Sequence, residues 1–266
     1  MLDWWLLTVF GFLVGILASM TGVGGGVFIV PILTFFYGFV VNAATGTSLA
    51  TIIFTAIAST FNYAKQKRVY YKTGLILVIT TAPGASIGYW LGSITKEPLL
   101  GKFFGIFLIL VALRTIISLI GNKTREKAQN VKTDTELVHS GKTITFGVGL
   151  GFFGGIASGL LGVGGGTLIV PIMTFALGMP IQFATATSMF TMIFTSISAV
   201  ATASVLSIYF PSNPIDFRVA LTLAAGSIIG AQVGAYTSKK LSGRNLTLIF
   251  GIILMIAGAN MIIKYW

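Results

Sequence analysis

The stretch GVGGGVFIVPILTF, residues Gly22 to Phe35, occurs twice in the chain. Residues Gly162 to Phe175 read GVGGGTLIVPIMTF, which is identical at 11 of 14 positions and lies 140 residues further on. Each copy places a run of glycines inside an apolar sequence, although a glycine in a helix interior costs roughly 1 kcal/mol relative to alanine. The proline that follows, Pro31 or Pro171, cannot donate a helical hydrogen bond. The repeated stretch therefore predicts two helix breaks at corresponding positions of a duplicated chain.

The composition is that of a polytopic membrane protein. Of the 266 residues, 55% are hydrophobic and only 9% are charged, whereas soluble domains carry about 25% charge. The net charge is +11, and the basic residues that cause it lie in short stretches between apolar runs. This distribution is typical of cytoplasmic loops beside anionic lipid and not of nucleic-acid binding. The chain has no cysteine, and its single histidine, His139, lies in a polar loop. We therefore expect no enzyme activity, no metal site and no cofactor.

Ten apolar segments are expected to be helices, because backbone groups in lipid must be hydrogen-bonded internally. Crossing a bilayer takes roughly 20 helical residues, and the third to fifth segments of each half meet this length. The first two segments of each half run short and flank a glycine cluster, so they form either two short spans or a re-entrant hairpin. The segments are 4–20, 27–41, 43–64, 74–94, 100–120, 144–161, 167–181, 183–207, 217–237 and 245–263.

The halves are expected to be a first transmembrane repeat, 1–120, and a second, 143–266, joined by a cytoplasmic linker, 121–142. The loop KQKRVYYK of the first half carries four basic residues, whereas its counterpart IYFPSNPIDF is followed by Arg218 alone. The next pair of loops reverses this bias. Because basic loops face the cytoplasm, equivalent loops lie on opposite sides. A cytoplasmic linker puts twelve Lys and Arg inside and four outside, which favours inverted-topology repeats with both termini outside.

The glycine clusters are candidate binding elements. A helix that starts just after each cluster would direct unpaired N–H groups into the break, and such a helix N-terminus attracts anions. Unwound segments at corresponding positions of two repeats also indicate a transporter's binding site. Close helix packing is the alternative, and we prefer it for the ladders Gly84/Gly88/Gly92 and Gly226/Gly230/Gly234. The candidate site residues are Gly22, Gly24, Gly25, Gly26, Gly162, Gly164, Gly165 and Gly166.

Polar side chains follow each glycine cluster at the start of a long segment. Their hydroxyl and amide groups can donate hydrogen bonds to an anion. They could equally cap the helix or bond back to its carbonyls, and the sequence leaves both interpretations open. The set comprises Asn42, Thr45, Thr47 and Ser48 in the first half and Gln182, Thr185, Thr187 and Ser188 in the second.

Acidic residues are missing from every predicted span, since all six lie in helix ends or loops. A proton relay through a membrane carboxylate is therefore not expected, and a cationic substrate would lack a counter-charge. Arg114 is the only basic residue at depth. It lies seven residues before Gly121, about 10 Å along a helix, so we expect its side chain to extend to the cytoplasmic face; the alternative is a cation beside the exit path. A neutral, donor-rich site fits a small anion.

Two copies of G-x-G-G-G-x-x-x-x-P, each followed by T-x-T-S, resemble the TauE/SafE family of sulfite exporters over nearly the whole chain. The motif falls on Gly22, Gly24, Gly25, Gly26 and Pro31, and again on Gly162, Gly164, Gly165, Gly166 and Pro171. The resemblance implies a bacterial or archaeal inner-membrane protein that moves small sulfur-containing anions such as sulfite, organosulfonates or thiosulfate. The direction of transport follows from the family name alone.

We expect a small anionic substrate and the lipid bilayer as partners, and no nucleic acid. The sequence leaves a homo-oligomer open. It also leaves open a passive channel for the same anions and a non-transport membrane scaffold. A cation or amino-acid transporter would need a buried carboxylate, and the spans contain none.

Overall fold

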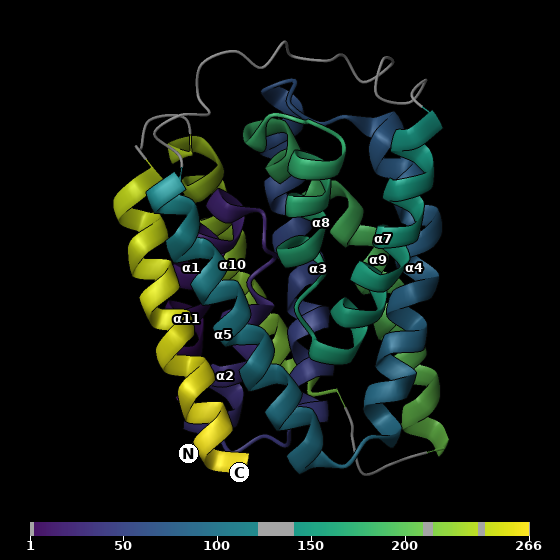
Figure 1. Ribbon diagram of the computed structural model, residues 1–266. Helices are drawn as coiled ribbons and strands as arrows, with labels where there is room; N and C mark the ends of the chain where they lie inside the picture. The colour runs from purple at the N-terminus through teal and green to yellow at the C-terminus, as the bar shows by residue number, and fades with distance from the viewer. Residues whose placement is uncertain (1–2, 122–140, 210–214, 239–242, 266) are drawn as a thin grey trace.

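The computed structural model describes residues 3–121, 141–209, 215–238 and 243–265, which form helices and no β-strand (Figure 1). The first half comprises α1 (Trp4–Thr21), α2 (Gly26–Phe36), α3 (Val41–Lys65), α4 (Tyr71–Ile94) and α5 (Glu97–Gly121). The second half comprises α7 (Gly141–Leu161), α8 (Gly166–Pro171), the π-helical turn η1 (Ile172–Ala176), α9 (Ile181–Tyr209), α10 (Phe217–Thr237) and α11 (Gly243–Tyr265). The all-helical prediction is confirmed. Most of the predicted linker, with His139, lies outside the described residues.

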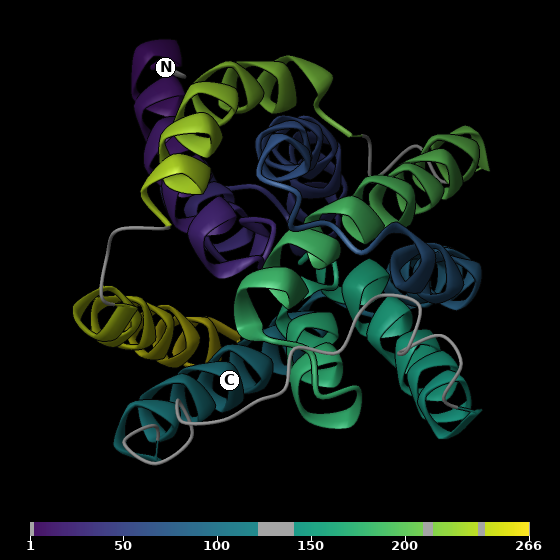
Figure 2. The same ribbon diagram turned by 90° about the horizontal axis from the view of Figure 1, so that it is seen from above.

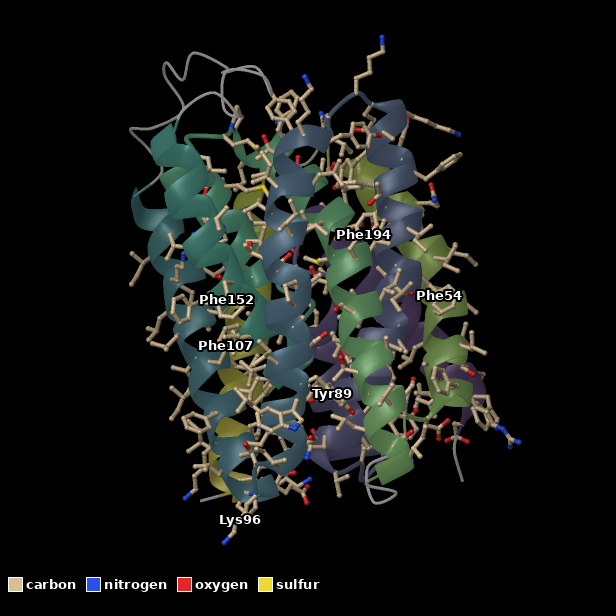
Figure 3. All side chains as sticks on the ribbon, turned by 90° about the vertical axis from the view of Figure 1, so that its right-hand side faces the viewer. Phe54, Tyr89, Lys96, Phe107, Phe152 and Phe194 are labelled. Atoms are coloured by element: carbon tan, nitrogen blue, oxygen red, sulfur yellow. The ribbon has the colours of Figure 1, made fainter. Side chains whose placement is uncertain are left out.

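Six of the described helices are long and apolar enough to cross a membrane: α1, α3, α4, α5, α9 and α10. Large apolar side chains cover the outside of the bundle. Phe54 on α3 and Phe194 on α9, for example, are both more than a third exposed and lie on the surface that Figure 3 presents. In water such a surface would be unfavourable, whereas in a bilayer it faces lipid chains. The chain is therefore a multi-pass membrane protein.

Glycine ladders hold the outer helix pairs together. α1 packs along α10, and α4 packs along α7. Gly84 and Gly88 of α4 lie against backbone of α7, where a methyl group on Gly88 would overlap the carbonyl of Ile156. Gly230 of α10 lies in the same way against Phe12 of α1. The interpretation of these ladders as packing faces is confirmed, since only a residue without a β-carbon allows this approach.

The helices of the two halves are arranged alike. α3 and α9 contact each other at the centre, α10 covers α3 beside α1, α4 covers α9 beside α7, and α5 pairs with α11 (Figure 2). Each of these contacts between the halves therefore has its counterpart when the halves are exchanged. In Figure 1, α3 and α9 run in opposite directions, and both termini lie at the end opposite the start of α7. This arrangement is compatible with inverted repeats, which stay a prediction.

Each glycine cluster forms the turn of a helical hairpin. In Figure 1, α1 rises from the end where the termini lie, the chain turns at the glycines, and α2 runs back. α7 descends from the other end, and α8 with η1 runs back in turn. The helix beyond the second cluster loosens after Pro171, since the N–H of Leu177 reaches the carbonyl of Ile172, five residues earlier. α1, with 18 residues, and α7, with 21, are longer than the short segments predicted, and each turns at its glycine cluster into a shorter helix. Both glycine clusters thereby lie in the bundle interior.

A first prediction concerns the α4–α7 ladder. We expect Gly88→Ala to lower the apparent melting temperature in detergent, because its methyl group overlaps the Ile156 carbonyl and overpacking costs about 1–3 kcal/mol. Gly92→Ala is the matched control, because the nearest atom outside its own helix turn, the carbonyl oxygen of Leu160, lies 3.4 Å from the added carbon. Equal melting temperatures for the two variants would contradict the packing role of Gly88.

Candidate functional site

The two glycine clusters are true breaks in the helices. In the first break, Gly22–Gly25, three glycines have left-handed backbone: φ is 74° at Gly22, 85° at Gly24 and 92° at Gly25. In the second break, Gly162–Gly165, the corresponding φ values are 69°, 78° and 83°. Residues with a β-carbon adopt this conformation only at a cost of about 1–2 kcal/mol each. The glycine runs are therefore required by backbone geometry, and the predicted interruption of both helices is confirmed.

Each break leaves backbone donors without an acceptor. In the described part of the chain, the N–H groups of Gly24, Gly25, Gly26 and Val27 donate to no carbonyl or side chain. The N–H groups of Gly164, Gly165, Gly166 and Thr167 are likewise unpaired among the described residues. Buried backbone N–H groups are nearly always paired in folded proteins. Two runs of unpaired donors at corresponding buried positions are what an anion-binding site provides.

Hydroxyl groups link each break to the other half of the chain. Ser48 of α3 donates its hydroxyl to the carbonyl oxygen of Gly162 at 2.8 Å. Ser188 of α9 shares its hydroxyl proton between the carbonyl oxygens of Gly22, at 2.9 Å, and of Thr185 in its own helix, at 2.8 Å. Both serines are fully buried. The two bonds between the halves correspond to each other under the 140-residue offset. Each break is thus closed by a serine from the opposite half, a pairing that the sequence alone does not predict.

The two threonines one turn earlier contact the same breaks. A methyl group on Gly162 would lie 2.7 Å from the Cα atom of Thr45, and one on Gly22 would lie 2.9 Å from that of Thr185. The Oγ1 atom of Thr45 is buried and has no hydrogen-bond partner. The structure therefore brings Thr45 and Ser48 to the second break and Thr185 and Ser188 to the first.

Two apolar side chains that sequence reasoning missed lie beside both breaks. Ile52 of α3 and Met192 of α9 are fully buried, and both contact the positions of Gly24 and Gly164. They are themselves 140 residues apart, so applying the repeat offset to the whole of each long helix could have found them. In this conformation the breaks also contact each other directly, since a methyl group on Gly26 would overlap the Gly162 carbonyl and one on Gly166 would overlap the Gly22 carbonyl.

Four predicted residues lie elsewhere. The Oγ1 atoms of Thr47 and Thr187 accept hydrogen bonds from the backbone N–H groups of Asp216 and Tyr70, just before α10 and α4. These threonines therefore anchor the starts of neighbouring helices. Asn42 is half-buried beside Gly92, and Gln182 is exposed at the start of α9. No described contact joins either amide to a break.

The acidic residues lie at helix starts throughout the described residues: Asp3 precedes α1, Glu97 begins α5 and Asp216 caps α10. No group of three or more His, Cys, Asp or Glu side chains gathers among these residues. Arg114 of α5 is exposed on the outside of the bundle. That position agrees with a side chain that extends along the lipid boundary toward the end of α5.

Sequence comparison supplies the family. The family described as "Sulfite exporter TauE/SafE" matches residues 7–261. The chain belongs to the TauE/SafE family. Among its relatives, the probable membrane transporter protein YunE of Bacillus subtilis is 32% identical over 270 residues, covering 97% of this chain and 96% of the relative. A probable membrane transporter protein of Methanocaldococcus jannaschii is 30% identical over 267 residues, covering 97% and 95%. No solved structure matches this TauE/SafE protein.

A second prediction separates backbone strain from contact at the first break. Gly22 and Gly38 share left-handed backbone, with φ of 74° and 68°, so alanine strains both equally. A methyl group on Gly22 would lie 2.9 Å from the Ser188 hydroxyl oxygen, whereas one on Gly38 meets nothing within 4 Å. We expect Gly22→Ala to lower the melting temperature more than Gly38→Ala does. The overpacking adds about 1–3 kcal/mol of destabilisation. Equal effects of the two substitutions would contradict the close contact of α9 with the first break.

Proposed function

We propose that this TauE/SafE protein transports small sulfur-containing anions, such as sulfite, organosulfonates or thiosulfate, as an exporter in the inner (plasma) membrane. The anion binds between the two glycine breaks. The backbone N–H groups of the breaks and the hydroxyl groups of Thr45, Ser48, Thr185 and Ser188 are its donors. The proposal includes two inverted repeats, a cytoplasmic linker 121–142 and both termini outside.

The single observation that carries this proposal is the pair of unpaired donor runs, at Gly24–Val27 and Gly164–Thr167, held within one interior by cross-bonds from Ser48 and Ser188. An oxyanion presents several acceptor oxygens at once, and a converging set of N–H and O–H donors can satisfy them without a full positive charge. A desolvated cation would gain nothing from such a set. The acidic residues of the described helices all lie at helix starts, so no carboxylate repels the anion.

The serine bonds suggest how the site opens. With Ser48 bonded to Gly162, Ser188 bonded to Gly22, and the two breaks in direct contact, the described conformation is closed. To admit an anion, the serine hydroxyls exchange a carbonyl acceptor for an anion oxygen. Since each serine stands on one half and its acceptor on the other, this exchange couples binding to relative movement of the halves, as alternating access requires.

The test is uptake into proteoliposomes with sulfite, sulfoacetate, thiosulfate and sulfate compared side by side. We expect saturable uptake of at least one sulfur-containing anion, counterflow when the vesicles are preloaded with the same anion, and no uptake into protein-free vesicles. Flux without saturation or counterflow would indicate a passive channel. Absence of both flux and binding for all four anions would contradict the proposed function and favour a membrane scaffold.

A third prediction concerns the two serines. We expect the double variant Ser48→Ala/Ser188→Ala to reduce anion uptake at least tenfold, since it removes the only groups proposed to pass from break carbonyl to substrate. The matched control is Ser93→Ala/Ser207→Ala, because these exposed serines bond only to carbonyls of their own helices, at 2.7 Å and 2.8 Å. Equal uptake by both double variants, at equal protein incorporation, would contradict the role of the serines.

A further inference from the structure

The two breaks differ in the hydroxyl groups that surround them. Ser158 of α7 precedes the second break at the position where Ala18 of α1 precedes the first, 140 residues earlier. Thr167 at the start of α8 likewise stands where α2 has Val27. The second break therefore has two hydroxyl groups that the first lacks, whereas Ser19 and Thr21, which stand where the second half has Gly159 and Leu161, bond to carbonyls of their own helix. The near-identity of the glycine motifs conceals this difference, because Ser158 lies before the motif and Thr167 occupies one of its variable positions.

Two hydroxyl groups at the second break are buried without a partner. Ser158 and Thr45 are each 1% exposed, and neither the Oγ atom of Ser158 nor the Oγ1 atom of Thr45 makes a hydrogen bond in the described structure. Ser158 faces Gly165, since a methyl group there would lie 3.4 Å from its hydroxyl oxygen. Thr45 adjoins Gly162. At the first break, by contrast, Ala18 has no hydroxyl, and Thr185, the counterpart of Thr45, is less deeply buried at 6% exposed.

Unpaired hydroxyl groups at the second break add to unpaired main-chain donors. The N–H groups of Gly164 and Gly165 have no acceptor among the described residues, and they belong to the same five-residue segment that Thr45 and Ser158 contact. Each buried polar group without a partner destabilises the fold, so several at one place are best explained by a ligand that pairs with all of them. A tetrahedral or pyramidal oxyanion accepts from several donors at once.

On the strength of the proposed function, we infer that the anion binds asymmetrically, at the second break, with Ser158 and Thr45 as hydroxyl donors beside the N–H groups of Gly164 and Gly165. The first break, with Ala18 and Val27 in place of Ser158 and Thr167, offers fewer hydroxyl donors and closes against the second. One chain then holds one anion. Ser158 becomes a binding residue that the repeated motif does not include.

The chain offers matched controls for both residues. Ser196 of α9 is fully buried with an unpartnered hydroxyl, like Ser158, and Thr60 of α3 is buried with an unpartnered hydroxyl, like Thr45. Neither Ser196 nor Thr60 is among the nearest contacts of a break glycine. Ser158→Ala can therefore be compared with Ser196→Ala, and Thr45→Val with Thr60→Val. Each pair removes the same group from the same kind of environment.

The experiment measures the dissociation constant of the purified protein for thiosulfate and for sulfite by calorimetry, together with the melting temperature without anion. We expect Ser158→Ala and Thr45→Val to weaken binding at least tenfold, and both controls to stay within about twofold of the unmodified protein. All four variants should melt no lower than the unmodified protein, because each loses an unpaired buried hydroxyl. Weaker binding in a protein of undiminished stability separates a binding role from a folding role.

Two failures are distinguishable. If the unmodified protein binds anions but Ser158→Ala matches Ser196→Ala and Thr45→Val matches Thr60→Val, the asymmetric site is overturned and the proposed function stands. If the unmodified protein neither binds nor transports thiosulfate, sulfite, sulfoacetate or sulfate, the proposed function itself is overturned. If Ser158→Ala melts lower than its control, Ser158→Cys replaces it, and if Thr45→Val melts lower than its control, Thr45→Ser replaces it. Because Thr45→Ser keeps the hydroxyl, retained affinity in that variant supports the inference and lost affinity contradicts it.

Discussion

The fold depends on an exchange of hydrogen bonds between its two halves. Each glycine break exposes a carbonyl group in an apolar interior, where an unpaired polar group costs several kcal/mol in the absence of water. The hydroxyl of Ser48 satisfies the carbonyl of Gly162, and that of Ser188 satisfies the carbonyl of Gly22. Neither half could bury its own break alone, because the serine that pairs with it belongs to the other half.

This exchange links the packing of the bundle to the proposed function. The glycine ladders pack α1 of the first half against α10 of the second, and α4 of the first half against α7 of the second. The outer helices of the two halves are therefore packed against each other. The hairpins then carry both breaks into the same interior, beside α3 and α9 at the centre of the bundle. What remains unpaired there is a set of N–H and O–H donors. We propose that this interior, which is rich in donors and has no carboxylate inside its described helices, selects for negative charge through dipoles alone.

Much of this architecture follows from the sequence. Glycine runs at a fixed offset predicted the breaks, because left-handed backbone favours residues without a β-carbon, and the apolar segments predicted the helices. The partners of the breaks could not be predicted, because the T-x-T-S motifs show which residues are polar and not which half they face. Thr47 and Thr187, at the middle of those motifs, turn to the starts of α10 and α4 instead. Ser158 was missed because it lies just before the motif, where only a comparison with Ala18 reveals it.

The most direct test of the central claim observes the break amides themselves. Labelling valine with carbonyl ¹³C and glycine with ¹⁵N selects only glycines that follow valine, which are Gly15, Gly24, Gly149, Gly164 and Gly234. Gly24 and Gly164 lie in the breaks, and the other three lie in α1, α7 and α10. Titration with thiosulfate is predicted to shift the amide signals of the break glycines, Gly164 most, while the helical glycines change little. Unchanged signals from both break glycines at an anion concentration that saturates transport would contradict the account.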